Sequence, residues 1–104
     1  MPRHRWFISI LILGGLLVGS QISGCAGAPV QEMSNARQAL VAAERVGAEK
    51  YAPELYTEAV NLVKSAQANI RKQEFRQARD DAELAREKAI EARRISEAAV
   101  AAEK

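Results

Sequence analysis

The feature that most constrains the fold is a series of small residues in the C-terminal third of the chain, at alternating spacings of three and four positions. The series consists of Phe75, Ala78, Ala82, Ala85, Ala89, Ala92, Ser96 and Ala99. Because an α-helix has about 3.6 residues per turn, this spacing places all of them on one helix face. Side chains this small let a neighbouring helix approach closely. The series therefore predicts a long helix over residues 75–102 with its alanine face buried.

Two shorter helices are predicted upstream of this one. Residues 34–46 form the first, with Ser34 or Asn35 as its N-cap and Gly47 closing its C-terminus. Its predicted apolar face consists of Met33, Ala36, Leu40 and Ala43. Residues 53–72 form the second, because Pro53 suits the first turn of a helix. Its predicted apolar face consists of Leu55, Tyr56, Ala59, Leu62, Val63, Ala66 and Ile70.

The arrangement of these helices follows from the lengths of their links. Residues 47–52 are predicted to be a break, whereas the link around residues 73–74 is short, and short links make neighbouring helices antiparallel. Strand signals are absent. The predicted fold class is all-α, an antiparallel helical hairpin or a three-helix bundle over residues 33–104. The last turns of the long helix are expected to overhang its neighbours and to leave apolar surface for a partner or a second copy.

The charged residues indicate no nucleic-acid partner. The chain of 104 residues has 15 basic and 13 acidic residues, and without Arg3 and Arg5 the two numbers are equal. A clustered basic surface, as nucleic-acid binding requires, is therefore not indicated. The charges between the alanines of residues 75–99 are predicted to form a solvated face with pairs at i,i+4, such as Arg79 with Glu83 and Arg93 with Glu97.

The N-terminal 24 residues have the pattern of a targeting signal. Arg3, His4 and Arg5 form a positive segment, and the apolar residues 6–18 follow it. The next residues, Ile22, Ser23, Gly24 and Cys25, resemble the lipobox of bacterial lipoproteins. This resemblance implies cleavage before Cys25 and attachment of a diacylglycerol to its thiol, with a further acyl chain on the new amine.

Two other interpretations of the same segment remain open. One is an ordinary signal peptide cut after Ala28, although Pro29 would then follow the cut, which signal peptidases disfavour. The other is an uncleaved anchor helix over residues 6–22, which at 17 residues is at the lower limit for a membrane span and contains several glycines.

The lipobox resemblance also implies a location. Two or three acyl chains on Cys25 hold a protein on a bilayer far more firmly than one. Residues 25–32 then act as a short tether, so that the folded part lies close to the lipid headgroups. In Gram-negative lipoproteins an Asp after the cysteine favours the inner membrane. Ala26 stands there in this chain, which implies the outer membrane with the helical domain facing the periplasm.

The helical part resembles a bacterial family of unknown function, over roughly residues 33–99. The segments that carry the resemblance are Gly47-Ala48, Tyr51-Ala52-Pro53-Glu54-Leu55, Phe75-Arg76-Gln77-Ala78-Arg79 and Ala82-Glu83-Leu84-Ala85. The members are small alanine-rich helical lipoproteins, some of them fused to an OmpA-like peptidoglycan-binding domain. This chain lacks the OmpA-like domain, so the resemblance does not imply peptidoglycan binding here.

Residues for enzymatic chemistry are missing from the part after the leader. His4 is the only histidine and Cys25 the only cysteine, so nucleophilic sites that pair Ser or Cys with His and the usual zinc sites are excluded there. A glycine-rich phosphate loop is also missing. We expect no enzyme, no metal, no small-molecule substrate and no cofactor other than the covalent lipid.

The expected function is therefore structural: a membrane-tethered helical domain that presents a face to an envelope protein or to a second copy of itself. One alternative is a covalent linker to peptidoglycan through the C-terminal Lys104, as in the major outer-membrane lipoprotein of enteric bacteria. Against it, that protein is an uninterrupted coiled coil, whereas Gly47 and Pro53 interrupt this chain. Another alternative is an accessory subunit of an envelope transport or assembly complex.

Overall fold

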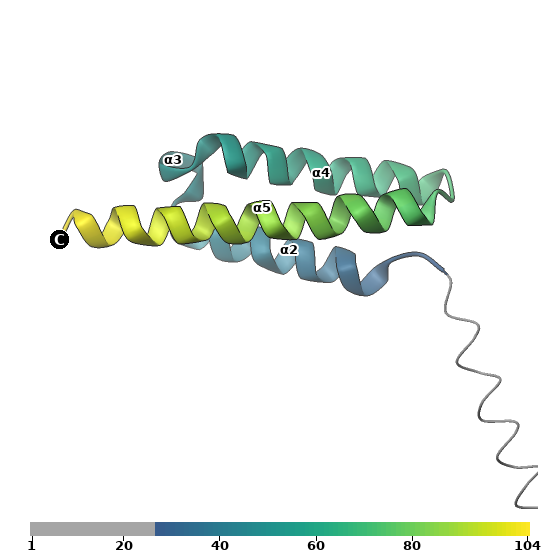
Figure 1. Ribbon diagram of the computed structural model, residues 1–104, viewed down its shortest axis with the longest axis horizontal. Coiled ribbons are helices and arrows are strands. Elements are labelled where there is room, and N and C mark those ends of the chain that lie inside the picture. The colour runs from purple at the N-terminus through teal and green to yellow at the C-terminus, as the bar shows by residue number, and fades with distance from the viewer. Residues whose placement is uncertain (1–26) are drawn as a thin grey trace, which may run out of the picture.

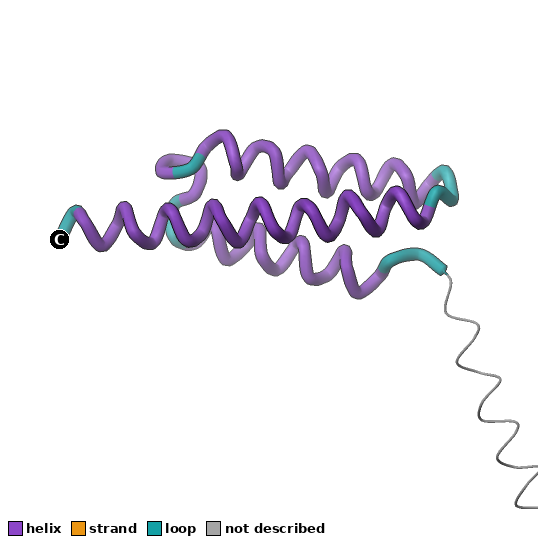
Figure 2. The backbone as a smooth tube through the Cα atoms, viewed as in Figure 1, coloured by secondary structure: helices purple, strands orange, loops and turns teal. Residues whose placement is uncertain are grey.

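The computed structural model of the protein describes residues 27–104, which form helices joined by short turns (Figure 1). The helices are α2 (Val30–Arg45), α3 (Ala48–Tyr51), α4 (Pro53–Arg71) and α5 (Phe75–Ala102). All regular structure within this part of the chain is helical, as Figure 2 shows. The predicted all-α fold is confirmed. Of the two predicted arrangements, the long helices α2, α4 and α5 adopt the three-helix bundle.

Helix α2 begins four residues before the predicted start, and the predicted N-cap residues, Ser34 and Asn35, are wrong. The helix follows Pro29, whose carbonyl oxygen accepts a hydrogen bond from the backbone N–H of Met33 at 3.0 Å. No side chain caps this end. Ser34 and Asn35 lie inside the helix, where their side-chain oxygens accept hydrogen bonds from glutamines four residues away. The helix thus extends one turn further towards the N-terminus than the cap residues indicate, because a favourable N-cap side chain does not prevent the residues before it from being helical.

The predicted break at residues 47–52 contains the short helix α3. Gly47 has a left-handed backbone with φ of 83° and ends the preceding helix, as predicted. Its carbonyl oxygen then accepts hydrogen bonds from the N–H groups of Lys50 and Tyr51, at 2.9 and 3.0 Å, which starts a new helical turn. Ala48 and Ala52 on this turn are buried. A single turn is too short to show a helical period, so the sequence pattern does not reveal it.

The link between α4 and α5 is a tight turn. Gln73 adopts a left-handed backbone with φ of 63°, and the N–H of Glu74 donates to the carbonyl oxygen of Asn69 at 2.9 Å. These are the features of a Schellman motif, in which a glycine is more usual than Gln at the left-handed position. The turn reverses the chain, and α4 and α5 are antiparallel as predicted (Figure 1).

Helices α2 and α5 run in the same direction and α4 runs against both (Figure 1). One end of the bundle therefore holds the starts of α2 and α5 and the end of α4. We call this end, residues 27–30 and 71–76, the tether end. The opposite end, residues 46–52 and 100–104, is called the far end. At 1.5 Å per residue, the 28 residues of α5 span about 42 Å between the two.

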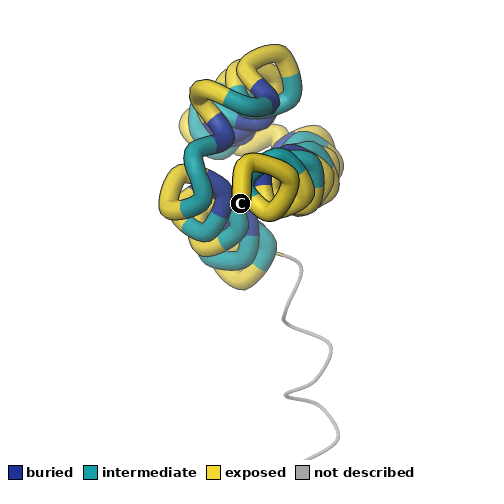
Figure 3. Tube along the Cα trace, turned by 90° about the vertical axis from the view of Figure 1, so that its left-hand side faces the viewer, coloured by how far each residue is buried: buried dark blue, intermediate teal, exposed yellow. Residues whose placement is uncertain are grey.

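The core lies between the three long helices, and the predicted apolar faces form it (Figure 3). Helix α5 packs extensively on both α4 and α2, which contact each other much less. The fully enclosed face of α5 consists of Ala78, Ala82, Ala85, Ala89, Ala92 and Ser96. Ser96 satisfies its hydroxyl by donating to the carbonyl oxygen of Ala92 at 2.7 Å. A buried serine therefore fits this alanine face without an unpaired polar group.

The predicted overhang of the long helix is partly covered. Helix α5 continues beyond the other helices at the far end (Figure 1). There the hydroxyl of Tyr51, on α3, donates to the carboxylate of Glu103, with 2.8 Å to each oxygen. The short α3 thus packs against the last turns of α5 and reduces the surface that an isolated helix end would expose.

Candidate functional site

The residues with a predicted covalent role fall at the two ends of the chain. Cys25 and the other lipobox residues, Ile22, Ser23 and Gly24, lie outside the described residues. Lys104 is described. It is exposed, and it follows the end of α5, where its backbone N–H donates to the carbonyl oxygen of Ala101 at 3.3 Å.

The chain just after the predicted lipid attachment point is fastened to the bundle. Pro29 is fully buried, and Gly27 offers its carbonyl oxygen to Arg79 Nη2 at 3.4 Å. Arg79 Nε also lies 3.6 Å from Glu32 Oε1. Such partly exposed ion pairs stabilise a fold by at most about 1 kcal/mol. The burial of Pro29 therefore contributes more than this ion pair to fixing residues 27–30 on the bundle, and Arg79 connects the segment to α5.

This arrangement changes two predictions made from the sequence. Of the residues predicted to form a tether, 25–32, Pro29 is buried and residues 30–32 belong to α2, so these positions are part of the packed domain. The predicted pair of Arg79 with Glu83 does not form. Arg79 reaches across to α2 instead, because a partner on a neighbouring helix is available at the same height. The other predicted pair is confirmed, with Arg93 Nε 2.6 Å from Glu97 Oε1.

A hollow at the far end includes Lys104. Its lining consists of Arg45, Val46, Glu97, Val100, Ala101 and Lys104. The carboxylate of Glu97 is already engaged by Arg93. Beside this hollow, Lys50 Nζ lies 3.4 Å from the Tyr51 hydroxyl and 4.9 Å from the centre of its ring. The hydrogen bond to Tyr51 and the nearby negative charge of Glu103 raise the pKa of Lys50, so its ammonium group is charged at neutral pH.

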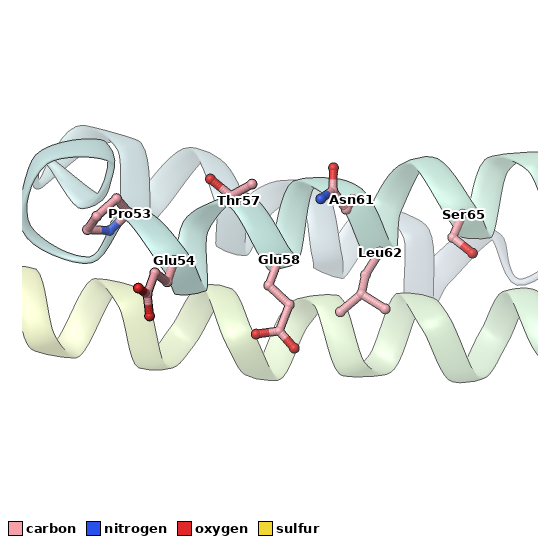
Figure 4. Close-up of a pocket in the computed structure, with 7 residues that line it drawn as sticks. All are labelled: Pro53, Glu54, Thr57, Glu58, Asn61, Leu62 and Ser65. Atoms are coloured by element: carbon pink, nitrogen blue, oxygen red, sulfur yellow. The ribbon is translucent and has the colours of Figure 1, made fainter.

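A second hollow runs along the surface of α4 (Figure 4). It is lined by Pro53, Glu54, Thr57, Glu58, Asn61, Leu62 and Ser65. Glu54, Glu58 and Leu62 point towards α5, whereas Asn61 points away from it. Glu58 Oε1 lies 3.5 Å from Lys88 Nζ on α5. Because all the lining residues come from one helix, this hollow is an open surface groove without the converging polar groups of an enclosed ligand site.

Tyr56 is half-buried between α2 and α4. Its hydroxyl donates to Glu44 Oε1 at 2.6 Å. This hydrogen bond, with burial and the negative charges of Glu44 and Glu49, raises the pKa of Tyr56 well above its ordinary value. A tyrosine held in this way remains protonated and acts as a structural hydrogen-bond donor.

The residues of the bundle offer no metal site and no membrane span. Within residues 27–104, acidic, histidine and cysteine side chains nowhere gather in threes around a point that could hold a metal ion. None of the described helices combines the length and the apolar character needed to cross a bilayer.

Comparison with protein families identifies the helical part. The family described as Domain of unknown function (DUF4398) matches residues 31–104. The chain belongs to this family. The DUF4398 match begins at the second residue of α2 and continues to the end of the chain, so the family domain is the three-helix bundle itself. The predicted resemblance of residues 33–99 to a family of unknown function is thereby confirmed.

The DUF4398 match does not include Cys25 or the segment before it. Comparison with the curated proteins and with the solved structures found no match.

Proposed function

We propose that the protein is a lipoprotein of the cell envelope, anchored through acyl chains on Cys25, in which the DUF4398 bundle has a structural or protein-interaction role. The observation that carries the proposal is the leader: a basic start, an apolar stretch, and Ile22-Ser23-Gly24-Cys25 directly after it. The expected location is the outer membrane, facing the periplasm, since Ala26 follows the cysteine. No catalytic role is assigned to any residue, and the covalent lipid is the only non-protein group.

The start of the bundle supports the anchor. Gly27 is the second residue after Cys25, and two residues of extended chain span only about 7 Å. Gly27 contacts Arg79, and Pro29 is packed in the domain. A lipid on Cys25 would therefore hold the tether end of the bundle directly at the membrane surface. The far end and the sides of the three helices would remain accessible to a partner.

The experiment that tests the anchor is the intact mass of the native protein from the membrane fraction. We expect the mass of residues 25–104 plus two or three acyl chains. The matched control is Cys25→Ser, which removes the thiol to which the lipid is attached and should leave the leader uncleaved and without acyl chains. A wild-type mass without lipid would refute the proposal. If the acyl chains are present, crosslinking of the wild-type protein in intact cells would identify the partner or show a second copy.

A covalent link to the cell wall through Lys104 is a second candidate function. Lys104 is exposed at the far end, which is separated from the tether end by the length of α5, about 42 Å. This places an amine at the end of the bundle farthest from the proposed anchor, where a linker needs it. If the link exists, digestion of the wall with lysozyme leaves a muropeptide-sized mass on wild-type protein but not on Lys104→Arg. A wild-type protein without the added mass, or an equal added mass on Lys104→Arg, would exclude this function.

A further inference from the structure

We infer that the tether end of the bundle is a membrane-contact surface that binds the anionic headgroups of the bilayer. The inference rests on the lipid anchor proposed above and specifies which face of the bundle meets the lipid. The surface consists of Val30 together with Arg71, Lys72 and Arg76, which lie around the turn between α4 and α5.

The first observation is the charge of this end. Arg71, Lys72 and Arg76 are exposed, and none of them forms an ion pair within residues 27–104. The one acidic residue between positions 71 and 76 is Glu74, which is also exposed. One turn further into the bundle, Arg79 forms an ion pair with Glu32. Asp81 accepts hydrogen bonds from α4. The remaining acid at this level, Asp80, is exposed. The outermost layer, which would meet the headgroups first, is therefore positively charged.

The second observation is that Arg76 opposes the local preference of its own helix. It lies in the first turn of α5, which contains no acidic residue; the acid at this helix start is the N-cap residue Glu74, whose side chain forms no capping hydrogen bond. A helix start carries partial positive charge, so an arginine there is unfavourable and an acid is favourable. Such departures from local preference are expected where a sequence is constrained by something other than the stability of the fold.

The helix ends add to the same field. The tether end contains the starts of α2 and α5 but only one helix end, that of α4 (Figure 1). Backbone N–H groups at helix starts carry no intrahelical partner and attract phosphate groups. The starts of α2 and α5, which carry partial positive charge, and the end of α4, which carries partial negative charge, therefore face the proposed position of the bilayer.

The third observation is apolar. Val30 is the most exposed of the large hydrophobic side chains in the described residues, with 75% of its surface accessible. It lies at the start of α2, three residues after Gly27. An exposed apolar side chain at the same end of the bundle as basic residues is the combination that favours the headgroup region of a membrane. The occupant that fits this surface, on charge and on the position of the tether, is the lipid bilayer itself.

The test uses the mature lipidated protein, purified and placed in vesicles of phosphatidylcholine, with or without added phosphatidylglycerol. Because the anchor consumes the Cys25 thiol, Gln73→Cys provides one free thiol for a fluorescent donor at the tether end. Ala102→Cys provides the same at the far end. Energy transfer to acceptor-labelled headgroups then reports how close each end lies to the bilayer. We expect transfer from position 73 to increase with phosphatidylglycerol and to decrease with added salt, and transfer from position 102 to change little.

The decisive variant reverses Arg71, Lys72 and Arg76 to glutamate in the Gln73→Cys background. The matched control reverses Arg37, Lys64 and Arg94, three exposed cations away from the tether end. Each basic residue near an anionic leaflet strengthens association about fivefold. We therefore expect the first triple variant to reduce at least tenfold the population of molecules whose tether end lies on the bilayer. Energy transfer from position 73 should then no longer increase with phosphatidylglycerol, whereas the control variant should behave as the wild type does.

The outcomes separate this inference from the anchor. The contact surface is refuted, and the anchor remains, if intact mass shows the acyl chains but energy transfer from position 73 does not change with phosphatidylglycerol. The same conclusion follows if the two triple variants behave alike. If the mass shows no acyl chain, both fail. Circular dichroism of the variants confirms that each is still helical, so that a loss of transfer reports the surface and not the fold.

Discussion

The hydroxyl of Ser65 on α4 donates to Asp81 Oδ2 on α5 at 2.7 Å, and Asn69 Nδ2 donates to the same oxygen at 2.9 Å. Gln77 Nε2 lies 3.4 Å from the other carboxylate oxygen of Asp81. Elsewhere the contact between the two helices is largely apolar, with the alanine face of α5 against residues such as Ala59, Val63 and Ala66 of α4. Its other polar contact is the partly exposed ion pair of Glu58 with Lys88. Apolar contacts define a register less strictly than directional hydrogen bonds do. The carboxylate of Asp81 bonds to two residues one turn apart on α4, and so specifies a single register.

Replacing Asp81 with alanine should destabilise the bundle. The change removes two short hydrogen bonds to a charged group, each of which contributes about 1.5–3 kcal/mol when buried. Because the site is partly exposed, we expect the free energy of unfolding to decrease by about 1–2 kcal/mol in total. Urea unfolding of the protein, followed by circular dichroism, measures this change. Asp80→Ala removes an adjacent exposed carboxylate as a control, and equal effects of the two variants would contradict the role of Asp81.

The buried faces could be predicted from the sequence because their period is that of the helix. Every predicted position of α2, from Met33 to Ala43, is buried, as are the alanines of α5 from Ala78 to Ala92. The roles of the charged residues could not be predicted. Asp81 belongs to the series of charges expected to be solvated, yet it bonds to α4. Its sequence neighbours are all charged or alanine, and nothing local distinguishes it from Asp80.

The sequence alone leads only to the proposed covalent parts of the candidate site. Attachment at Cys25 or Lys104 can be proposed from sequence because a covalent attachment depends on one residue and its immediate neighbours. The fastening of the tether depends on Arg79, which meets Gly27 and Glu32 only after α5 has packed beside α2. The proposed contact surface combines the cations around the turn between α4 and α5 with Val30 at the start of α2. The cations lie close together in the sequence, but only the packing of α2 beside α5 brings Val30 to the same end of the bundle.

A side chain at Gly47 should be costly. The residue has φ of 83°, and a Cβ there would lie 3.2 Å from two ring carbons of Tyr51. Alanine in a left-handed backbone costs about 1–2 kcal/mol, and the contact adds to this unless the ring moves. We expect Gly47→Ala to lower the free energy of unfolding by at least about 1 kcal/mol. Gly27→Ala is the control, because a Cβ there meets nothing within 4 Å. A neutral Gly47→Ala would show that α3 shifts easily.

The alanine face of α5 should not tolerate a larger residue. Ala85 has no accessible surface and lies in the core cluster with Met33, Leu40 and Val63. Leucine at this position forces the helices apart, and such overpacking typically costs about 1–3 kcal/mol. Glu91→Leu places the same side chain on the exposed side of α5 and should leave stability nearly unchanged. Thermal unfolding of both variants measures the difference, and a stabilised Ala85→Leu would show that the bundle contains unused space.

The stability of the bundle should decrease in strongly alkaline solution because of Tyr56. Its pKa is raised in the folded state from an ordinary value of 10.0, chiefly because its hydroxyl donates to Glu44. Below pH 10 both states keep the proton and the hydrogen bond contributes in full. Above pH 10 the unfolded state loses the proton while the folded state retains it, so the free energy of unfolding falls by at most about 1.4 kcal/mol per pH unit.

Comparison with Tyr56→Phe isolates this effect. The two proteins differ only in the Tyr56 hydroxyl, so every other effect of pH is common to the two measurements. The wild type should be the more stable protein at neutral pH and should lose its advantage as pH increases beyond 10, so that the two unfolding curves converge. Urea unfolding at a series of pH values gives the difference directly. A difference that stays constant through this range would mean that Tyr56 ionises equally in both states, and that its hydrogen bond to Glu44 does not hold the proton.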